Sequence, residues 1–310
     1  MELRQLRYFV AIVDHGSLSR AALVLHVAQP ALTQQLRQLE GELGVQLLHR
    51  SAQGVLSTDA GKIFYEHALA ILKQVADAQA AVIQSAERPS GSVTLGLPHS
   101  ISGALALPLL TAARARFPEI TLQLTEEITG NLIQQLQSGR LNLAVLFDDG
   151  QLGNFIASAL VEEDLAFICR ADSAHAPRGH AIRFADALAV PLILPAQQQG
   201  VRPRLEQVAR SAGLTFADVI EINSIAILKS ALLADMGATI LPVAPLQAEI
   251  ASGVLAACPI IDPAIARRVA LCASRNIPLT NAAAAISRLV RQVTEELCAC
   301  AAWRGARIIG

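Results

Sequence analysis

Residues 17–39 alternate between apolar and polar side chains with the period of two short helices joined by a turn. Ser17 can cap the first helix, because its hydroxyl can accept a hydrogen bond from the free N–H groups of the opening turn. Gln29-Pro30 predicts the start of the second helix, since proline loses no hydrogen bond at the first helical position. The positions expected to face inward are Leu18, Ala21, Ala22, Leu25, Ala31, Leu32, Leu36 and Leu39.

The second of these helices keeps a polar face, formed by Gln29, Thr33, Gln34 and Arg37. Glutamine can pair with adenine through two hydrogen bonds, and threonine can donate to a base or contact the thymine methyl group. Such a face is typical of the recognition helix of a helix-turn-helix, which enters the DNA major groove. An ordinary helical hairpin with a solvated polar face gives the same pattern, so these residues alone leave both interpretations open.

The flanking residues extend this unit to 1–58. Apolar residues at 3–13 recur at helical spacing and predict a first helix that packs under the pair. Two short extended segments, 47–50 and 55–57, surround Gly54 and predict a β-hairpin wing. A wing lies against the DNA backbone or the minor groove, so Arg50 is expected to contact a phosphate, as is Arg37.

A single long helix is predicted from residue 59 to about residue 86, with a length of roughly 40 Å. Its apolar residues step by four and three for almost three heptads, which is the spacing of a coiled-coil seam that needs a partner helix. We therefore expect a dimerisation helix within the linker 59–88, followed by a hinge at 89–91, where proline and glycine end the helix. The seam residues are Phe64, Ala68, Ile71, Val75, Ala78 and Val82.

Beyond the hinge, predicted strands and helices alternate, which favours mostly parallel sheets covered by helices. The order of the elements predicts two α/β units, because the chain is expected to leave the first unit and later return to it. The first unit comprises 92–161 and 266–300, the second comprises 162–265, and 301–310 is expected to be a tail.

Composition narrows the class of protein. The 310 residues are 53% hydrophobic and contain no plausible spanning helix, and charged residues at the N-terminus argue against a secretory signal, so a cytoplasmic location is expected. The five cysteines show no C-x-x-C spacing and predict neither a disulfide framework nor a metal site; buried free thiols are expected. A net charge of −1 gives no general support for nucleic-acid binding, so the DNA hypothesis depends on the helix pattern.

Several spaced motifs now occur in order: Q29-P30-A31-L32-T33, then L39-E40-x-E-L-G-x-x-L-L-x-R50, then T58-D59-A60-G61. Through these, and through Leu107-Pro108, 117–119, 139–144 and Leu241-Pro242, nearly the whole chain resembles the LysR-type transcriptional regulators. The run at 16–32 is similar to their nitrogen-assimilation-control subgroup. The resemblance adds Thr58 to the expected DNA contacts, beside Gln29, Pro30, Thr33, Gln34, Arg37 and Arg50.

What the resemblance implies is an α+β multidomain protein: an N-terminal winged helix-turn-helix, a long linker helix, and a C-terminal α/β effector domain of two lobes, similar to periplasmic binding proteins. Its implied partners are double-stranded promoter DNA, further copies of itself as a homodimer and homotetramer, RNA polymerase and a small-molecule effector. The family often carries arginine at the position of Gln34, so the base preference of relatives does not transfer to this chain.

An effector site is expected at the carboxyl ends of the strands. The loop 98–103 is predicted to enter a helix N-terminus, which attracts anions, and Ser100 and Ser102 can bind ligand there or simply cap the helix. Thr129 lies at the end of another predicted strand of the same lobe, and the resemblance implies contributions of Gln198 and Ser224 from the opposite lobe. No arginine is placed in this cleft by the sequence, although Arg202 lies nearby in the chain. A weakly charged or neutral effector, or none, is therefore an open alternative, and regulation by protein level alone would need no effector.

No catalytic motif is found: G-x-S-x-G, H-E-x-x-H, a phosphate loop and G-x-G-x-x-G are all missing from the sequence. We therefore expect no enzyme activity, no metal and no cofactor. The alternative to a DNA-binding regulator is a small-molecule-binding protein whose N-terminal helices serve assembly only.

Overall fold

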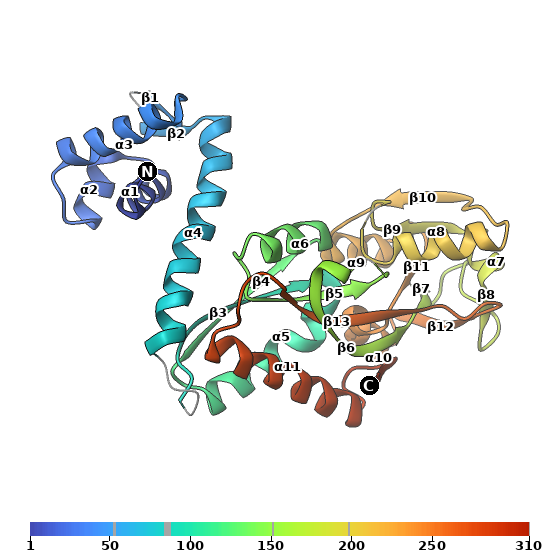
Figure 1. Cartoon of the computed structure of the whole chain (residues 1–310). Helices are drawn as coiled ribbons and strands as arrows, with labels where there is room; N and C mark the ends of the chain where they lie inside the picture. The colour runs from blue at the N-terminus through green and yellow to red at the C-terminus, as the bar shows by residue number, and fades with distance from the viewer. Residues whose placement is uncertain (52–53, 84–87, 151, 198, 310) are drawn as a thin grey trace. The chain divides into compact units, whose positions relative to one another are not determined.

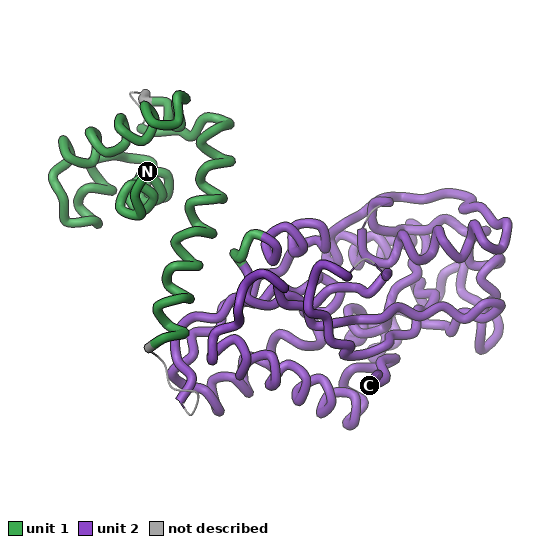
Figure 2. The backbone as a smooth tube through the Cα atoms, viewed as in Figure 1, with its two compact units in different colours: residues 1–83, 138–140 green, residues 84–137, 141–310 purple. Residues whose placement is uncertain are grey.

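The computed structural model describes residues 1–51, 54–83, 88–150, 152–197 and 199–309. The chain divides into two compact units, shown in Figure 2. Unit 1 contains residues 1–83 and 138–140, and unit 2 contains residues 84–137 and 141–310. Within the described ranges, no helix is both long enough and apolar enough to span a bilayer.

Unit 1 is a helical domain with a small hairpin (Figure 1). Ser17 accepts a hydrogen bond from the backbone N–H of Arg20, which confirms its predicted role as a cap. Leu32, Leu36 and Leu39 are buried as expected, but Ala31 is exposed. Ala31 lies about 100° around the helix from Leu32, outside the narrow stripe that faces the core. The elements are α1 (Leu3–His15), α2 (Leu18–Val24), α3 (Gln29–Leu43), β1 (Leu48–Ser51), β2 (Gly54–Ser57) and α4 (Asp59–Ile83).

The apolar seam of α4 has a first part that packs in the core of unit 1 and a second part that is largely exposed. Phe64 meets Phe9 of α1 edge to face with ring centroids 5.1 Å apart, and Ala68 is fully buried in the same core. Phe64 is only half-buried and its dimer contact stays a prediction, whereas the prediction that Ala68 forms a dimer contact is wrong. The reason is length: α1, about 20 Å long, covers only the first half of α4, which is about 37 Å long. Farther along, Ile71 is 38% and Val82 is 87% exposed.

Unit 2 contains two lobes, and lobe I is built on a six-stranded sheet in the order β14-β6-β13-β5-β3-β4. Its strands are β3 (Gly91–Pro98), β4 (Ile120–Glu127), β5 (Leu143–Asp148), β6 (Phe155–Asp164), β13 (Ala266–Ser274) and β14 (Ala306–Ile308). Helices α5 (His99–Arg116) and α11 (Asn281–Ala299) share one core with this sheet, while α6 (Thr129–Gln137) packs in a second core.

The sheet of lobe I is mixed, so the expectation of a mostly parallel sheet is wrong there. Strand β3 runs parallel to β4 and β5, but β13 and β14 pair antiparallel with their neighbours. The sequence pattern missed β6 and β14, and the antiparallel pairs of this sheet are β13 with β5, β13 with β6 and β14 with β6. Because β6 runs to Asp164, lobe I extends past the expected boundary at residue 161.

Lobe II contains a four-stranded sheet in the order β11-β7-β12-β8 and a parallel pair, β9 and β10. Its strands are β7 (Ala166–Arg170), β8 (Ile182–Arg183), β9 (Pro191–Leu194), β10 (Asp218–Glu221), β11 (Thr239–Leu241) and β12 (Leu255–Ile261). Its helices are α7 (Phe184–Leu188), α8 (Arg202–Ser211), α9 (Ile225–Leu233) and α10 (Gln247–Ala251). Two 3-10 turns, Leu152–Asn154 and Ala244–Leu246, complete the elements of unit 2.

The C-terminal residues are not a free tail. Strand β14 pairs antiparallel with β6, with Arg307 opposite Glu162. Trp303 is only 1% exposed and belongs to the core of lobe I. The segment expected to be a tail from residue 301 is therefore part of lobe I, because its one large aromatic side chain fills that core.

Candidate DNA-binding face and effector cavity

The polar face of α3 is open in unit 1. Gln29, Gln34 and Arg37 are exposed and Thr33 is half-buried, while the apolar face of the same helix is buried. Gln29 Oε1 accepts a hydrogen bond of 3.1 Å from Ser19 Oγ of α2, so its side chain is held in place at the helix start. The helix begins with Pro30 in its first turn, as the sequence predicts.

The connection from α3 to the wing is fixed by a carboxylate. Glu40 Oε1 accepts hydrogen bonds from the backbone N–H groups of Leu47 and Leu48, at 2.9 and 3.2 Å. This contact orients β1 relative to α3. The backbone of Arg50 lies in β1 opposite Val55, but the side chain of Arg50 is outside the described residues.

Thr58 has a structural role. Its hydroxyl donates to the carbonyl oxygens of Gln46 and Leu47, at 2.8 and 3.1 Å, and accepts from the N–H of Gly61 at 2.9 Å. A hydroxyl has one hydrogen and two lone pairs, so little capacity is left for a phosphate. Thr58 thus caps α4, and its expected DNA contact stays a prediction.

The predicted loop at 98–103 does not exist. Strand β3 ends at Pro98 and α5 begins directly at His99, so both serines lie inside the first turns of the helix. Neither serine caps the helix, whose N-cap residue is Pro98. Ser100 is 8% exposed, and Ser102 Oγ donates to the carbonyl of His99 at 3.1 Å.

A cavity of about 50 Å³ lies between the two lobes of unit 2. Of the five residues expected to bind an effector, Ser100 and Thr129 line it. Ser102 and Ser224 are not among its described lining residues; Ser224 instead caps α9, accepting from the N–H of Ile227 at 3.4 Å. Gln198 is outside the described residues. From lobe II the cavity receives Pro195, Gln199, Gly200, Val201, Asn223, Ile225 and Leu241.

Arg267 also lines this cavity, and the sequence pattern did not indicate it. Its side chain is 4% exposed, and its Nε and Nη2 donate to Glu163 Oε2 at 2.8 and 2.7 Å. Nη2 also donates to Ser100 Oγ at 2.9 Å, and the guanidinium carbon lies 4.1 Å from the centre of the Phe147 ring. Glu163 Oε1 accepts from Trp303 Nε1 at 2.8 Å. The only signal in the sequence was a charged residue at the start of an apolar strand.

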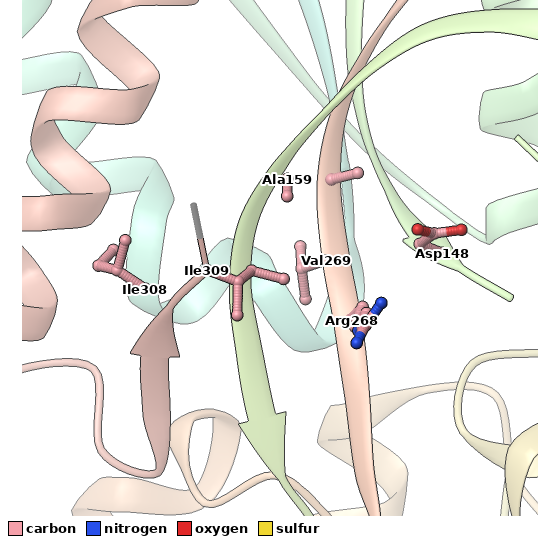
Figure 3. Close-up of a pocket in the computed structure, with 7 residues that line it drawn as sticks. Asp148, Ala159, Arg268, Val269, Ile308 and Ile309 are labelled. Atoms are coloured by element: carbon pink, nitrogen blue, oxygen red, sulfur yellow. The ribbon is translucent and has the colours of Figure 1, made fainter. Parts of the chain in front are cut away.

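Two further hollows lie near β13. One, of about 640 Å³, shares Thr129, Phe147, Gly200, Val201 and Arg267 with the small cavity and is also lined by Asp148, Arg204 and Arg268. The other, of about 420 Å³, is shown in Figure 3, where Ile308 and Ile309 come from the C-terminal segment and Asp148 and Arg268 from β5 and β13. Among the described lining residues of this third hollow, no buried polar atom lacks a hydrogen-bond partner.

The five cysteines are free thiols, and the prediction that they are buried holds for three of them. Cys169, Cys258 and Cys272 are buried free thiols, Cys298 is half-buried and Cys300 is exposed. Burial raises the pKa of Cys169 to about 11 and that of Cys272 to about 12, which keeps both thiols protonated. No group of three or more His, Cys, Asp or Glu residues suited to a metal ion occurs in the part of the chain that the structure describes.

Comparisons with known proteins agree with this architecture. Residues 3–62 match the family described as bacterial regulatory helix-turn-helix protein, lysR family, and residues 86–295 match the LysR substrate binding domain. The chain is 41% identical over 243 residues to the nitrogen assimilation regulatory protein nac of Escherichia coli, covering 78% of each protein. It is 30% identical to the hydrogen peroxide-inducible genes activator of Dickeya chrysanthemi, covering 94% of this chain and 95% of that protein.

Solved structures show the same fold. Full-length OxyR from Pseudomonas aeruginosa has a TM-score of 0.67 at 22% identity and covers 95% of this chain and 97% of its own. Full-length CbnR in complex with its target DNA has a TM-score of 0.55 at 24% identity and covers 95% and 100%. The two matched families are regulatory and neither is catalytic. The chain therefore belongs to the LysR family and is a DNA-binding transcriptional regulator with an effector-binding domain.

Proposed function

We propose that this regulator reads promoter DNA with the polar face of α3, in which Gln29, Thr33 and Gln34 contact base edges and Arg37 holds a phosphate. The observation that carries the proposal is that Gln29, Gln34 and Arg37 are exposed, and Thr33 is half-buried, on a helix whose Leu32, Leu36 and Leu39 face the core. Pro30 sets the start of the helix, and Arg50 of the wing adds a second phosphate contact. Recognition helices read bases from their N-terminal residues, which is where the two glutamines and the threonine lie.

Two copies of the chain bind two half-sites. The part of the α4 seam beyond Ala68 supplies a dimer contact, because an apolar row at heptad spacing needs a partner helix. In this part Ile71, Ala78 and Val82 are exposed and Val75 is half-buried. A tetramer then forms through the effector lobes, and the promoter-bound assembly contacts RNA polymerase. A protein that reads chromosomal promoters acts in the cytoplasm.

The effector domain controls this binding through a small molecule held between lobes I and II. A ligand shifts the equilibrium between two quaternary arrangements only if it binds one of them better than the other. The change in spacing between helix pairs then alters the bending of the DNA. Two similar proteins are named nitrogen assimilation regulatory proteins, which supports the proposal that the target genes of this regulator serve nitrogen use.

The test is a fluorescence-anisotropy or gel-shift titration with DNA that flanks the gene of this protein, at low salt. Thr33→Ala should reduce the discrimination between promoter and random DNA by about tenfold, because one base contact accounts for about 1–3 kcal/mol. Arg37→Ala and Arg50→Ala should weaken both kinds of DNA alike and make the salt dependence shallower by about one counterion. Arg210→Ala, which changes an exposed arginine in α8, is the matched control. Unchanged affinity in all the α3 and wing variants would refute this assignment of the DNA contacts.

A second candidate function is small-molecule binding with N-terminal helices that only assemble the protein. The net charge of −1 and the single basic residue on the polar face of α3, Arg37, favour it, because DNA-binding surfaces are usually more basic. An intact dimer that binds ligand yet shifts no promoter fragment would identify this alternative.

A further inference from the structure

One buried donor in the inter-lobe cavity has no acceptor. Arg267 is 6% exposed, and Nε and Nη2 are satisfied by Glu163 and Ser100, but Nη1 is buried without a hydrogen-bond partner among the described residues. Arginine cannot shed its proton in a protein, so this group stays a donor. A buried donor without a partner is costly, and a ligand in the cavity that Arg267 lines can supply the missing acceptor.

Four helices begin at the same cavity. The lining includes Ser100 in the first turn of α5, Thr129 at the start of α6, Val201 just before α8 and Ile225 at the start of α9. The first N–H groups of a helix lack partners inside the helix, and the helix dipole makes this end positive. The N-cap residues Pro98 and Val201 provide no side-chain cap for α5 and α8. These converging ends favour an anion.

The carboxylates already present limit that anion, and one of them, Glu127, lines the cavity itself. Glu163 has no exposed surface and balances Arg267 through two charge-assisted hydrogen bonds. A dianion would place two more negative charges beside this buried carboxylate, whereas a monoanion adds one that the helix ends can balance. Part of the wall is apolar, with Ile128, Phe147 and Leu241, so the ligand carries a short hydrocarbon portion.

A second buried polar atom without a partner indicates which group the ligand carries beside its carboxylate. Gln199 Oε1 is buried without a hydrogen-bond partner among the described residues, and Gln199 lines the same cavity. An amide oxygen accepts hydrogen bonds, so the ligand must bring a hydroxyl or an amino donor. The carboxylate fits the space of about 50 Å³, and the remainder can extend into the neighbouring hollow of about 640 Å³, which also contacts Arg267.

We propose that the effector is a small monocarboxylate with a nearby hydroxyl or amino group, an α-hydroxy or α-amino acid, whose carboxylate binds Arg267 Nη1 and whose donor binds Gln199 Oε1. This inference rests on the proposed function, which places the effector between the lobes. It adds the chemical class of the effector and the two side chains that recognise it.

Calorimetric titration of the full-length protein with a panel of anions tests the class. L-lactate and L-serine should bind, whereas propionate, which lacks the donor, should bind about tenfold more weakly because Gln199 Oε1 then stays unpaired. Sulfate and phosphate should not bind at the same concentrations. Tighter binding of sulfate or phosphate than of every carboxylate, or equal binding of lactate and propionate, would overturn the proposal.

Variants test the two contacts separately. Gln199→Leu should abolish the preference for lactate over propionate while propionate affinity is kept. Since removing Arg267 alone would leave Glu163 buried without a counter-charge, the double variant Arg267→Met with Glu163→Gln keeps the site neutral and should lose carboxylate binding. Arg210→Gln, which changes an exposed arginine of α8 that is not among the described lining residues of either hollow, is the control and should bind as the parent protein does. Retention of binding by the double variant, shown to be folded by circular dichroism, would contradict the proposal.

The same preparations are titrated with promoter DNA in the absence of any carboxylate. DNA binding without carboxylate binding refutes the effector class and leaves the proposed DNA-reading function intact. Carboxylate binding without DNA binding refutes the proposed function and supports the assignment of the cavity.

Discussion

Gly61 is the glycine whose replacement tests the packing of unit 1 most directly. It lies in the first turn of α4, and a Cβ atom added there would be 2.0 Å from the carbonyl oxygen of Leu47 and 3.0 Å from its carbonyl carbon. Both are backbone atoms, and they are held in place. The Leu47 carbonyl accepts from the N–H of Thr58 at 2.9 Å, and the Leu47 N–H donates to Glu40. Gly61→Ala must therefore move the start of the wing or the start of α4.

The expected cost follows from these contacts. Displacing Leu47 breaks two hydrogen bonds, which costs about 1 kcal/mol for each bond. The repulsion that is left after this displacement costs about 1 kcal/mol more. The higher helix propensity of alanine stabilises α4 by about 1 kcal/mol and offsets part of this cost. Unit 1 should lose roughly 2 kcal/mol of stability. The matched control is Gly41→Ala in α3, where no atom lies within 4 Å of the added Cβ, so the same substitution should stabilise unit 1 by up to about 1 kcal/mol.

Hydrogen–deuterium exchange of the full-length protein, followed by mass spectrometry of peptides from α1 and α4, measures these changes locally. Gly61→Ala should accelerate exchange in unit 1 by about 30-fold, Gly41→Ala should slow it, and peptides from unit 2 should not change. An unchanged or slower exchange in Gly61→Ala would show that the wing yields freely, and the reasoning about a fixed Leu47 would then be wrong.

Three further predictions concern other parts of the chain. Trp303→Phe leaves the fully buried Glu163 without one charge-assisted hydrogen bond, so unfolding of unit 2 by urea should require about 1–3 kcal/mol less than in the parent protein. Burial raises the pKa of Cys272 to about 12 from its ordinary value of 9.0, so only the unfolded chain ionises this thiol just above pH 9, and stability should fall as the pH rises beyond that value. Alkylation at pH 8 should accordingly modify the exposed Cys300 first and Cys272 only after denaturation; early modification of Cys272 would contradict its burial. Val82→Asp should reduce dimer formation in sedimentation experiments without unfolding unit 1, because this side chain is 87% exposed; a dimer that persists would exclude the outer end of α4 as the contact.

Much of the local structure could be predicted because its signals are local. The cap at Ser17, the proline start of α3 and the buried stripe of Leu32, Leu36 and Leu39 all follow from residues within one or two helical turns. The same holds for the hairpin around Gly54. The polar face of α3 could be predicted for the same reason, since its outward direction follows from the inward stripe.

The elements that the sequence pattern missed depend on distant partners. Strand β6 pairs with β13, more than 100 residues away in the chain, and β14 forms only because it pairs with β6. Phe64 and Ala68 fit a dimer seam in the sequence, but α1 covers them in the folded unit. Periodicity gives the face of a helix and cannot say which neighbour covers it.

The amino-acid sequence by itself determined the helix-turn-helix, its polar face and the LysR family, because those features are written in short motifs with fixed spacing. Only the tertiary structure decided the cavity between the lobes. This cavity brings together Arg267, Ser100 and Gln199 from three distant segments. The buried Arg267 is paired with Glu163, which in turn accepts a hydrogen bond from Trp303. The physical reason is that burial and unpaired donors are properties of packing, and packing joins residues whose separation along the chain carries no signal.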